Sequence, residues 1–331
     1  MKKFFKIVGI IAVALIIIGA AGISYFNLTY PKVSPASNIK VELTKGRLDR
    51  GKYLVHNVAL CLDCHSTRDW TKNAGPIIPG TEGKGGDRFG EELGLPGTLY
   101  AKNITPVNLS SWTDGEILRA LTSGVNKDNK ALFPLMPFLS YRKLSKEDLY
   151  SIIAYIRTLK PIQNEVPESS INFPVSLIIK TLPEDYTANI PEPDKNDPKE
   201  YGKYLVTAAS CADCHTKMEK GEPVKGMDFA GGNTYKTHWG IIRSANITPD
   251  KETGIGNWTK EMFIARFKAY NLEEVQNMKV NGHEFNSVMP WTLLSGMTEE
   301  DLGAVYDYLM TQKPVRNSIT RYTPPEQMAL N

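Results

Sequence analysis

The sequence predicts an all-α protein with two tandem helical domains behind a single N-terminal membrane-spanning helix. Three observations support this prediction. The first residues form a long apolar run, the rest of the chain contains two copies of one unit, and each copy ends in a segment with helical periodicity. A chain of 331 residues is long enough for two domains of ordinary size, each with its own core.

The N-terminal segment is expected to carry the chain into or across a membrane. Lys2, Lys3 and Lys6 surround the start of an uncharged run from Ile7 to Phe26. A helix of that length covers about 30 Å, the thickness of a bilayer's hydrocarbon core. A cleaved secretory signal is the alternative, although its apolar region would be shorter. We expect residues 1–27 to be an anchor or signal, with the rest of the chain on the outer, periplasmic side of the cytoplasmic membrane.

The body of the chain contains two copies of one unit. The matching segments occur in the same order, and they are Gly51–Val55 with Gly202–Val206, Cys61–His65 with Cys211–His215, Asn103–Pro106 with Asn246–Pro249, Trp112–Thr113 with Trp258–Thr259, and Met136–Pro137 with Met289–Pro290. This shared order indicates an internal duplication. We expect one domain over residues 49–165, called the first repeat, and another over residues 199–318, called the second repeat.

Each repeat is expected to end in an amphipathic helix. The helix begins at a capping hydroxyl residue, Ser145 or Thr298, and ends before a proline, Pro161 or Pro314. Between these limits, apolar side chains recur at the spacing of one helical face. Strand signals are scarce in both repeats.

A shorter helix is expected ahead of the cysteines in each repeat. Its glycine, Gly51 or Gly202, lacks a Cβ and would permit a close helix crossing against Tyr155 or Tyr308.

The remaining segments are expected to be linkers. Residues 28–48 would space the first repeat from the membrane, and residues 319–331 would form a C-terminal tail. Residues 166–198 are rich in proline, which indicates an extended connector without regular structure. Within it, the apolar stretch 173–179 is expected to pack onto one of the two domains.

All four cysteines lie in two Cys-x-x-Cys-His segments. On a helix, cysteines at i and i+3 project to one side, so both sulfurs can bond the vinyl groups of one haem while the adjoining histidine reaches the iron. This spacing predicts two covalently bound haem c groups. The attachment residues would be Cys61, Cys64 and His65 in the first repeat and Cys211, Cys214 and His215 in the second.

The cysteines have three alternative roles: a zinc site, a thioredoxin-like redox pair, and structural disulfides. A Cys₄ zinc site would have to join the two segments across most of the chain and would leave the histidines unexplained. A thioredoxin-like pair needs a βαβ context, and disulfides between cysteines three apart are uncommon. Histidine accounts for only 5 of the 331 residues, so its presence directly after both cysteine pairs favours haem.

The second axial ligand of each iron is expected to be a methionine. Met136 is the only methionine between Met1 and Met218, and prolines on both sides would fix its loop. Met289 precedes a proline at the matching place of the second repeat. Core packing is the other role considered for these methionines. The alternative ligands His56, His238 and His283 have no counterparts between the repeats, so we expect them to be surface or structural histidines.

The repeated tryptophans, Trp112 and Trp258, and the two Asn-Ile-Thr-Pro segments are expected to line the haem or to donate hydrogen bonds toward its propionates. Plain core packing explains them equally well.

These residues resemble the class I cytochrome c fold in tandem, and in particular the di-haem and multi-haem cytochrome c subunits of bacterial membrane-bound dehydrogenases such as alcohol dehydrogenases. That family repeats Gly-x-Tyr-Leu before Cys-x-x-Cys-His, then Asn-Ile-Thr-Pro, Gly-Ile-Gly-x-Trp-Thr and Met-Pro. The second repeat has the fourth motif in full at Gly254–Thr259, whereas the first has only Ser110–Thr113. Its members often carry three haems, and this chain has motifs for two. The resemblance covers residues 49 to about 315 and implies that His65 and His215 are proximal ligands.

The expected function is electron transfer rather than catalysis. The donor would be a dehydrogenase or quinol oxidase, and the acceptor another cytochrome or a terminal oxidase. The alternative is a di-haem enzyme such as a cytochrome c peroxidase, which would need one open iron, whereas both repeats carry Met-Pro. With 39 Lys and Arg against 36 Asp and Glu and no basic run, nucleic acid is not an expected partner.

Overall fold

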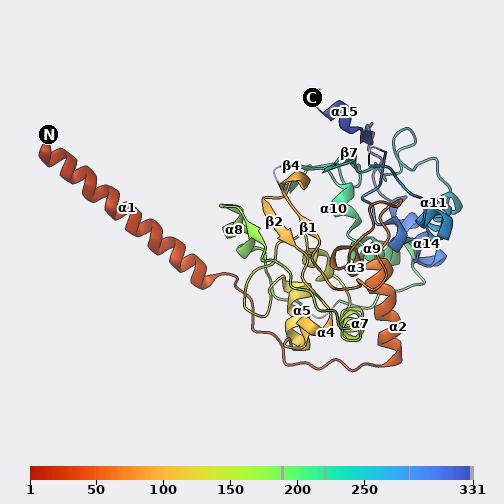
Figure 1. Cartoon of the computed structure of the whole chain (residues 1–331), viewed down its shortest axis with the longest axis horizontal. Coiled ribbons are helices and arrows are strands. Elements are labelled where there is room, and N and C mark those ends of the chain that lie inside the picture. Colours follow the sequence, from red (N-terminus) through yellow and green to blue (C-terminus); the bar gives the residue numbers. More distant parts are fainter. Residues whose placement is uncertain (188–189, 220, 283, 329–331) are drawn as a thin grey trace.

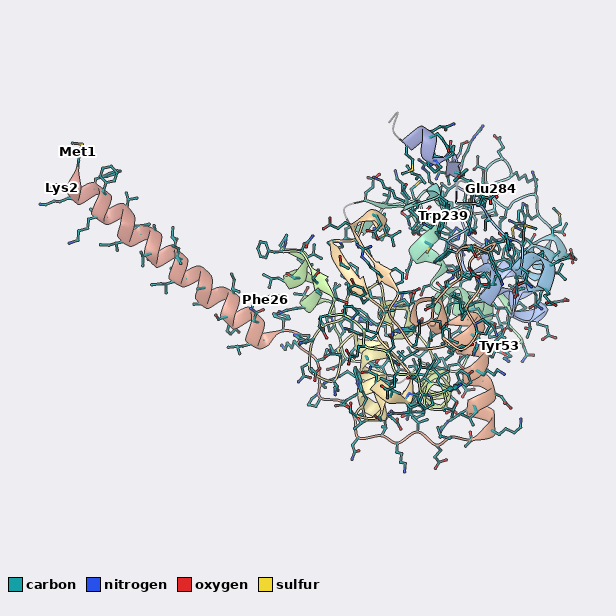
Figure 2. The ribbon with its side chains drawn as sticks, in the orientation of Figure 1. Met1, Lys2, Phe26, Tyr53, Trp239 and Glu284 are labelled. Carbon is teal, nitrogen blue, oxygen red and sulfur yellow. The ribbon has the colours of Figure 1, made fainter. Side chains whose placement is uncertain are left out.

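The computed structural model describes residues 1–187, 190–219, 221–282 and 284–328. One long helix, α1 (Lys2–Thr29), projects from a helix-rich body, as Figure 1 shows. Figure 2 shows Met1 and Lys2 at the free end of α1 and Phe26 near the end that joins the body. Within the described part of the chain, α1 is the one helix long and apolar enough to cross a membrane. A signal sequence near the N-terminus would pass the same test of length and composition.

The body contains short helices and a few longer ones. The helices of the first repeat are α2 (Lys45–Tyr53), η1 (Leu54–Val58), α3 (Cys61–His65), η2 (Glu91–Leu93), α4 (Pro106–Leu109), α5 (Asp114–Ser123), α6 (Phe138–Tyr141) and α7 (Lys146–Ile156). Those that follow are α8 (Val175–Ile178), η3 (Ile179–Thr181), α9 (Pro198–Ala208), α10 (Cys211–His215), α11 (Lys260–Lys268), η4 (Ala269–Asn271), α12 (Glu273–Gln276), α13 (Trp291–Leu294), α14 (Glu299–Leu309) and α15 (Pro325–Met328).

The two predicted C-terminal helices are present. Ser145 and Thr298 cap α7 and α14, and their hydroxyls accept hydrogen bonds from the amides of Asp148 (3.2 Å) and Asp301 (3.1 Å). The first helix of the first repeat, α2, begins at Lys45, four residues before the expected domain boundary, because Thr44 caps it.

The predicted close crossings are confirmed. α2 packs against α7, and α9 packs against α14. A Cβ added at Gly51 would lie 1.9 Å from the carbonyl oxygen of Ser151, and one added at Gly202 would lie 1.9 Å from that of Ala304. Each glycine also lies against the Cβ of the expected tyrosine, Tyr155 or Tyr308.

Short antiparallel strands were not anticipated, so the prediction of a purely helical chain is not confirmed. They form three small sheets with the orders β1-β2-β3, β4-β5 and β6-β7-β8. The strands are β1 (Arg88–Phe89), β2 (Gly97–Tyr100), β3 (Ser170–Ile171), β4 (Met218–Glu219), β5 (Glu222–Pro223), β6 (Thr234–Thr237), β7 (Gly240–Arg243) and β8 (Tyr322–Thr323). Strands of two to four residues are too short to leave a clear alternating pattern in the sequence.

Two of these strands come from segments that were expected to be linkers. β3 lies in the proline-rich segment 166–198 and pairs with β2, with Gly97 opposite Ile171. β8 lies in the C-terminal tail and pairs with β7, with Ile241 opposite Thr323. Residues 188–189 of the connector and 329–331 of the tail lie outside the described residues. Residues 170–171 and 322–323 are therefore parts of sheets rather than of free linkers.

The apolar stretch 173–179 packs onto the first repeat only in part. Ile179 is buried, but Phe173 and Ile178 are exposed. The stretch is therefore covered only in part, since Val175 and Leu177 are half-buried while Phe173 and Ile178 are exposed.

The two repeats contact each other reciprocally. The Tyr53 hydroxyl donates to the Asp301 carboxylate at 2.5 Å, and the Tyr204 hydroxyl donates to that of Asp148 at 2.7 Å. Each tyrosine also accepts from the amide of the other repeat's helix cap, Thr298 or Ser145, at 3.1 Å. Figure 2 labels Tyr53 where α2 meets the C-terminal elements. A single cluster of buried apolar side chains continues through both repeats, so they do not have separate cores.

A second contact between the repeats has no symmetric counterpart among the described residues. Asn286, ahead of Met289, accepts from the amide of Ala74 at 2.8 Å and donates to the Lys72 carbonyl at 3.0 Å. The rings of Trp70 and Trp239, the latter labelled in Figure 2, contact each other beside it at a tilt of 35°, with centroids 5.3 Å apart. The chain before Met289 is therefore fastened to the first repeat.

Candidate functional site

Both Cys-x-x-Cys-His segments form a five-residue helix, α3 or α10, that starts at a left-handed residue. Leu60 has φ 54° and Ser210 has φ 51°, a conformation that is uncommon for residues other than glycine. It breaks the preceding helix, so a new helical turn begins at the first cysteine. The same rare conformation at the same place in both repeats indicates a local requirement of the site.

The four cysteines are free thiols. Burial raises the pKa of Cys61 and Cys211 to about 12, which keeps them neutral. The described residues form no group of three or more His, Cys, Asp or Glu side chains that could hold a metal ion. The cysteine pair of each repeat is therefore available for thioether attachment.

The two motif histidines are held identically. The Nδ1 of His65 donates to the carbonyl of Lys102 at 2.6 Å, and that of His215 donates to the carbonyl of Ala245 at 2.7 Å. A carbonyl can only accept, so Nδ1 carries the proton and Nε2 keeps its lone pair. Burial lowers the pKa of both histidines, which also favours the neutral ring. This tautomer and orientation are those that a metal-ligating histidine needs.

The backbone of each motif histidine is hydrogen-bonded by a glycine that was not among the predicted site residues. The amide of Gly85 donates to the carbonyl of His65 at 2.8 Å, and that of Gly231 donates to His215 at 2.7 Å. A Cβ added at Gly85 would lie 2.5 Å from the Lys102 backbone, and one at Gly231 would lie 2.4 Å from Ala245. Both glycines start a Gly-Gly pair in the sequence, and a search of the duplication for such pairs would have found them.

The Asn-Ile-Thr-Pro segments position the carbonyl that receives the histidine proton. Asn103 directly follows Lys102, and its amide donates to the carbonyl of Ile162 at 2.9 Å. Asn246 follows Ala245 and donates to that of Val315 at 2.7 Å. Both asparagines are buried. These contacts tie each histidine's acceptor to the chain that follows α7 or α14, and the expected contact with propionates stays a prediction.

Trp112 and Trp258 are half-buried and pack against the apolar core cluster. This contact agrees with the simpler of the two roles expected for them.

Met136 and Met289 lie in turns of the same shape. The amide two residues after each methionine donates to its carbonyl, at 2.7 Å for Phe138 and 2.8 Å for Trp291. The intervening prolines have nearly equal angles, φ −79° and ψ 50° at Pro137 and φ −77° and ψ 57° at Pro290. These are inverse γ-turns. Both methionine side chains are half-buried against the core cluster.

The Met136 turn is fastened to the first cysteine motif. Tyr141, at the end of α6, is buried, and its hydroxyl donates to the carbonyl of Ala59. This bond joins the helix that follows the expected ligand loop to the chain two residues before Cys61. The second repeat has Leu294 in the place of Tyr141, so it lacks this hydrogen bond.

The other histidines have separate surroundings. The Nε2 of His56 bonds the hydroxyl of Tyr155 at 2.8 Å, and His238 packs edge-on against Trp239 with centroids 4.4 Å apart. His283 lies outside the described residues. The structural role expected for His56 is confirmed.

The two cysteine motifs lie near each other. The pKa of Cys214 is raised by burial and, in addition, by the carboxylates of Asp213 and of Asp63 in the other motif. Asp213 in turn contributes to raising the pKa of Tyr141 in the first repeat, after the larger effect of burial. Such mutual electrostatic effects require short separations.

Comparison with known proteins finds relatives of modest identity over most of the chain. The chain is 26% identical over 294 residues to the cytochrome c subunit of a quinone-dependent alcohol dehydrogenase from Gluconacetobacter polyoxogenes, with 83% of this chain and 58% of that protein aligned. It is 29% identical to the fructose dehydrogenase cytochrome subunit of Gluconobacter japonicus, over 70% of this chain and 47% of that protein. It is 28% identical to a diheme cytochrome c-type protein of Cereibacter sphaeroides, over 72% and 77%. No protein-family model matches the chain.

The resemblance expected from the sequence is therefore confirmed: the relatives of this chain are cytochromes c. More particularly, they include cytochrome c subunits of bacterial dehydrogenases, and this chain spans about half the length of the alcohol and fructose dehydrogenase subunits. These relatives imply covalently bound haem c and a role in electron transfer.

Proposed function

We propose that this chain is a di-haem c-type cytochrome that relays electrons from a dehydrogenase or quinol oxidase to a downstream cytochrome or terminal oxidase. The two tandem class I cytochrome c domains would be residues 49–165 and 199–318, each with one haem. The single observation that carries the proposal is the duplicated histidine geometry, in which Nδ1 is bonded to a backbone carbonyl and Nε2 is free.

The residues of the chain fit this cofactor. In each repeat a free cysteine pair would hold the porphyrin, and His65 or His215 would bind the iron through Nε2. Met136 and Met289 would be the second axial ligands. When bound, haem supplies an iron that accepts and gives up one electron, and a thioether ligand raises its reduction potential.

The protein's own contribution is to hold these groups still. The carbonyl behind each histidine keeps the ring neutral and oriented, and the proline turn limits the directions open to each methionine. With both axial positions filled by protein side chains, neither iron would keep a site for substrate. This coordination favours electron transfer over peroxidase chemistry.

The proposed location is the outer face of the cytoplasmic membrane, with α1 as a retained anchor. The length and apolar composition of α1 support a span, and the lysines at its start support a cytoplasmic N-terminus. The dehydrogenase partnership rests on the names of the relatives.

The test is purification from native membranes with gentle detergent, followed by identification of co-purifying oxidoreductase subunits and a redox titration of the haem bands. We expect low-spin haem, a dehydrogenase or quinol-oxidising partner, and reduction of the cytochrome by that partner's substrate. Mainly high-spin haem, or no reduction by any co-purifying partner, would contradict the proposal.

A further inference from the structure

A short apolar segment between the repeats is held rigidly but leaves apolar side chains uncovered. On one side β3 pairs with β2 of the first repeat. On the other side Glu184 pairs with Arg142 at 2.8 Å, and the hydroxyl of Tyr186 donates to the carbonyl of Leu144 at 3.0 Å. Ile179, between them, is buried. The segment therefore has a fixed place on the first repeat.

The same segment contacts the base of α1. The Lys180 ammonium donates to the Asn27 side chain at 2.6 Å. A few residues on, the Asp185 carboxylate accepts from both the amide and the hydroxyl of Ser34, at 2.7 and 2.9 Å. Figure 1 shows α8 on the side of the body from which α1 projects.

Phe173 and Ile178 point away from the protein on this side. Their exposed fractions are 75% and 54%. Among the described residues after α1, no other large apolar side chain is as exposed as Phe173. A rigid segment that leaves a phenylalanine and an isoleucine in water loses the gain from burying them, so a partner surface is expected.

The position of Asn27 identifies the kind of surface. The uncharged run of α1 ends at Phe26, so a membrane-spanning α1 would place Asn27 at the outer boundary of the hydrocarbon. Lys180 is bonded to Asn27 and must lie at the same depth. The rings of Phe26 and Tyr30 stack there with centroids 4.7 Å apart, as is typical of aromatic side chains at a membrane interface.

We propose that Phe173 and Ile178 insert into the outer interfacial layer of the bilayer that α1 crosses. The segment would be a second membrane contact that fixes how the two repeats are oriented above the lipid. This inference rests on the proposed anchoring by α1. It adds to that anchoring a defined orientation, which a single helix followed by a flexible linker would not provide.

The test uses the full-length, haem-loaded chain in vesicles of phosphatidylcholine. A nitroxide spin label is placed at residue 173 or 178 in the variants F173C and I178C. The matched control is M262C, because Met262 is 53% exposed on α11, away from α1. Collisions with oxygen and with a water-soluble nickel chelate report whether each label lies in lipid or in water.

We expect the labels at 173 and 178 to collide mainly with oxygen, and the label at 262 mainly with the nickel chelate. Aqueous accessibility at all three positions, in protein that still floats with the vesicles, would overturn the second contact and leave the anchor intact. Protein that does not float would overturn the anchor and the inference together. Labels at 173 and 178 that are shielded from both reagents only after a dehydrogenase is added would identify a protein partner and overturn the lipid assignment.

A second measurement tests the consequence for orientation. The double variant F173S/I178S should still float, because α1 is unchanged, but linear dichroism of the haem bands in oriented bilayers should decrease. M262S should retain the dichroism of the parent. Unchanged dichroism in the double variant would contradict the proposed role of the segment.

Discussion

The two repeats share the groups that would hold a haem and differ in the charges around them. Both have a glycine at a helix crossing, a histidine bonded to a backbone carbonyl, and a methionine in an inverse γ-turn. Around the first motif, however, the buried guanidinium of Arg68 lies 2.6 Å from the Asp63 carboxylate, and burial raises the pKa of Asp87 to about 6. The second repeat has Asn233 in the place of Asp87, and its amide donates to the carbonyl of Cys214 at 3.0 Å.

The duplication has therefore preserved the geometry of the site but not its electrostatics. Fixed charges near a haem shift its reduction potential, so two chemically identical irons in these surroundings should differ in potential. A relay benefits from such a difference because it sets the preferred direction of electron flow.

The contact between the repeats shows the same pattern. The Asp148 carboxylate accepts a hydrogen bond from the Tyr204 hydroxyl of the other repeat. It also forms an ion pair with the Arg50 guanidinium, whose two nitrogens lie 2.7 and 2.8 Å from its oxygens. The Asp301 carboxylate accepts a hydrogen bond from the Tyr53 hydroxyl, but the second repeat has Tyr201 in the place of Arg50 and so has no matching ion pair from this position. The two halves of the interface therefore share the tyrosine hydrogen bond, but the Asp148 half also has the ion pair with Arg50.

The largest effect is expected where the repeats are most alike. Gly51→Ala and Gly202→Ala should each destabilise the protein by about 3 kcal/mol or more, because a Cβ cannot fit 1.9 Å from a carbonyl oxygen. Gly46→Ala, in the same helix as Gly51 but with open space around it, is the control and should be neutral or slightly stabilising. Urea unfolding of the haem-loaded protein measures all three. A loss confined to one repeat would contradict the equivalence of the crossings.

Equivalent substitutions in the two halves of the interface should lower the free energy of unfolding by different amounts. Asp148→Asn should cost about 3 kcal/mol, because it leaves the half-buried Arg50 guanidinium without its partner. Asp301→Asn should cost only about 1 kcal/mol, because an amide oxygen can still accept from Tyr53. Equal losses in thermal or urea unfolding would mean that Arg50 does not account for the asymmetry.

Replacing either of the two expected methionine ligands should change its own haem in the same way. Met136→Ala should leave the first haem attached, lower its potential by on the order of 100 mV, and open it to carbon monoxide, because axial ligands set haem potentials over about 0.8 V. Met289→Ala should do the same to the second haem. Met278→Ala, at an exposed position, is the control. A redox titration with unchanged potentials in Met136→Ala would remove that residue as a ligand.

A further difference between the repeats should be a pH dependence to which Asp87 of the first repeat contributes and Asn233, in its place in the second repeat, cannot. Because the folded protein holds the Asp87 proton up to about pH 6 and the unfolded chain releases it near its ordinary pKa of 3.8, stability should fall as pH rises between these values. The loss should be about 1.5 kcal/mol, since water partly screens this carboxyl. Asp87→Asn, which copies the second repeat, should reduce this slope and be more stable at pH 7, whereas Asp63 and Asp213, whose pKa values burial also raises, would still contribute to it. An unchanged slope in urea unfolding at pH 4 to 7 would refute the assignment.

The sequence was sufficient to predict what depends on local patterns. The helix caps at Ser145 and Thr298 and the crossings at Gly51 and Gly202 are confirmed. Three-residue spacing and capping chemistry are visible in the chain itself, and the duplication doubles each signal.

What could not be predicted depends on contacts between distant segments. The strand β3 in the proline-rich segment forms because it pairs with the edge of β2. The sequence around residues 170–171 contains no signal of that pairing. The carbonyls of Lys102 and Ala245 bond the histidines through their backbone, so the two side chains can differ completely. The left-handed Leu60 and Ser210 are likewise set by the fold rather than by residue preference.

The most direct test of the account is the mass of the mature polypeptide after denaturation, from a host that can attach haem. We predict that two haem masses remain bound, and that changing Cys61 and Cys64 to serine together removes only one of them, as changing Cys211 and Cys214 does. A polypeptide of unmodified mass from such a host would contradict the account.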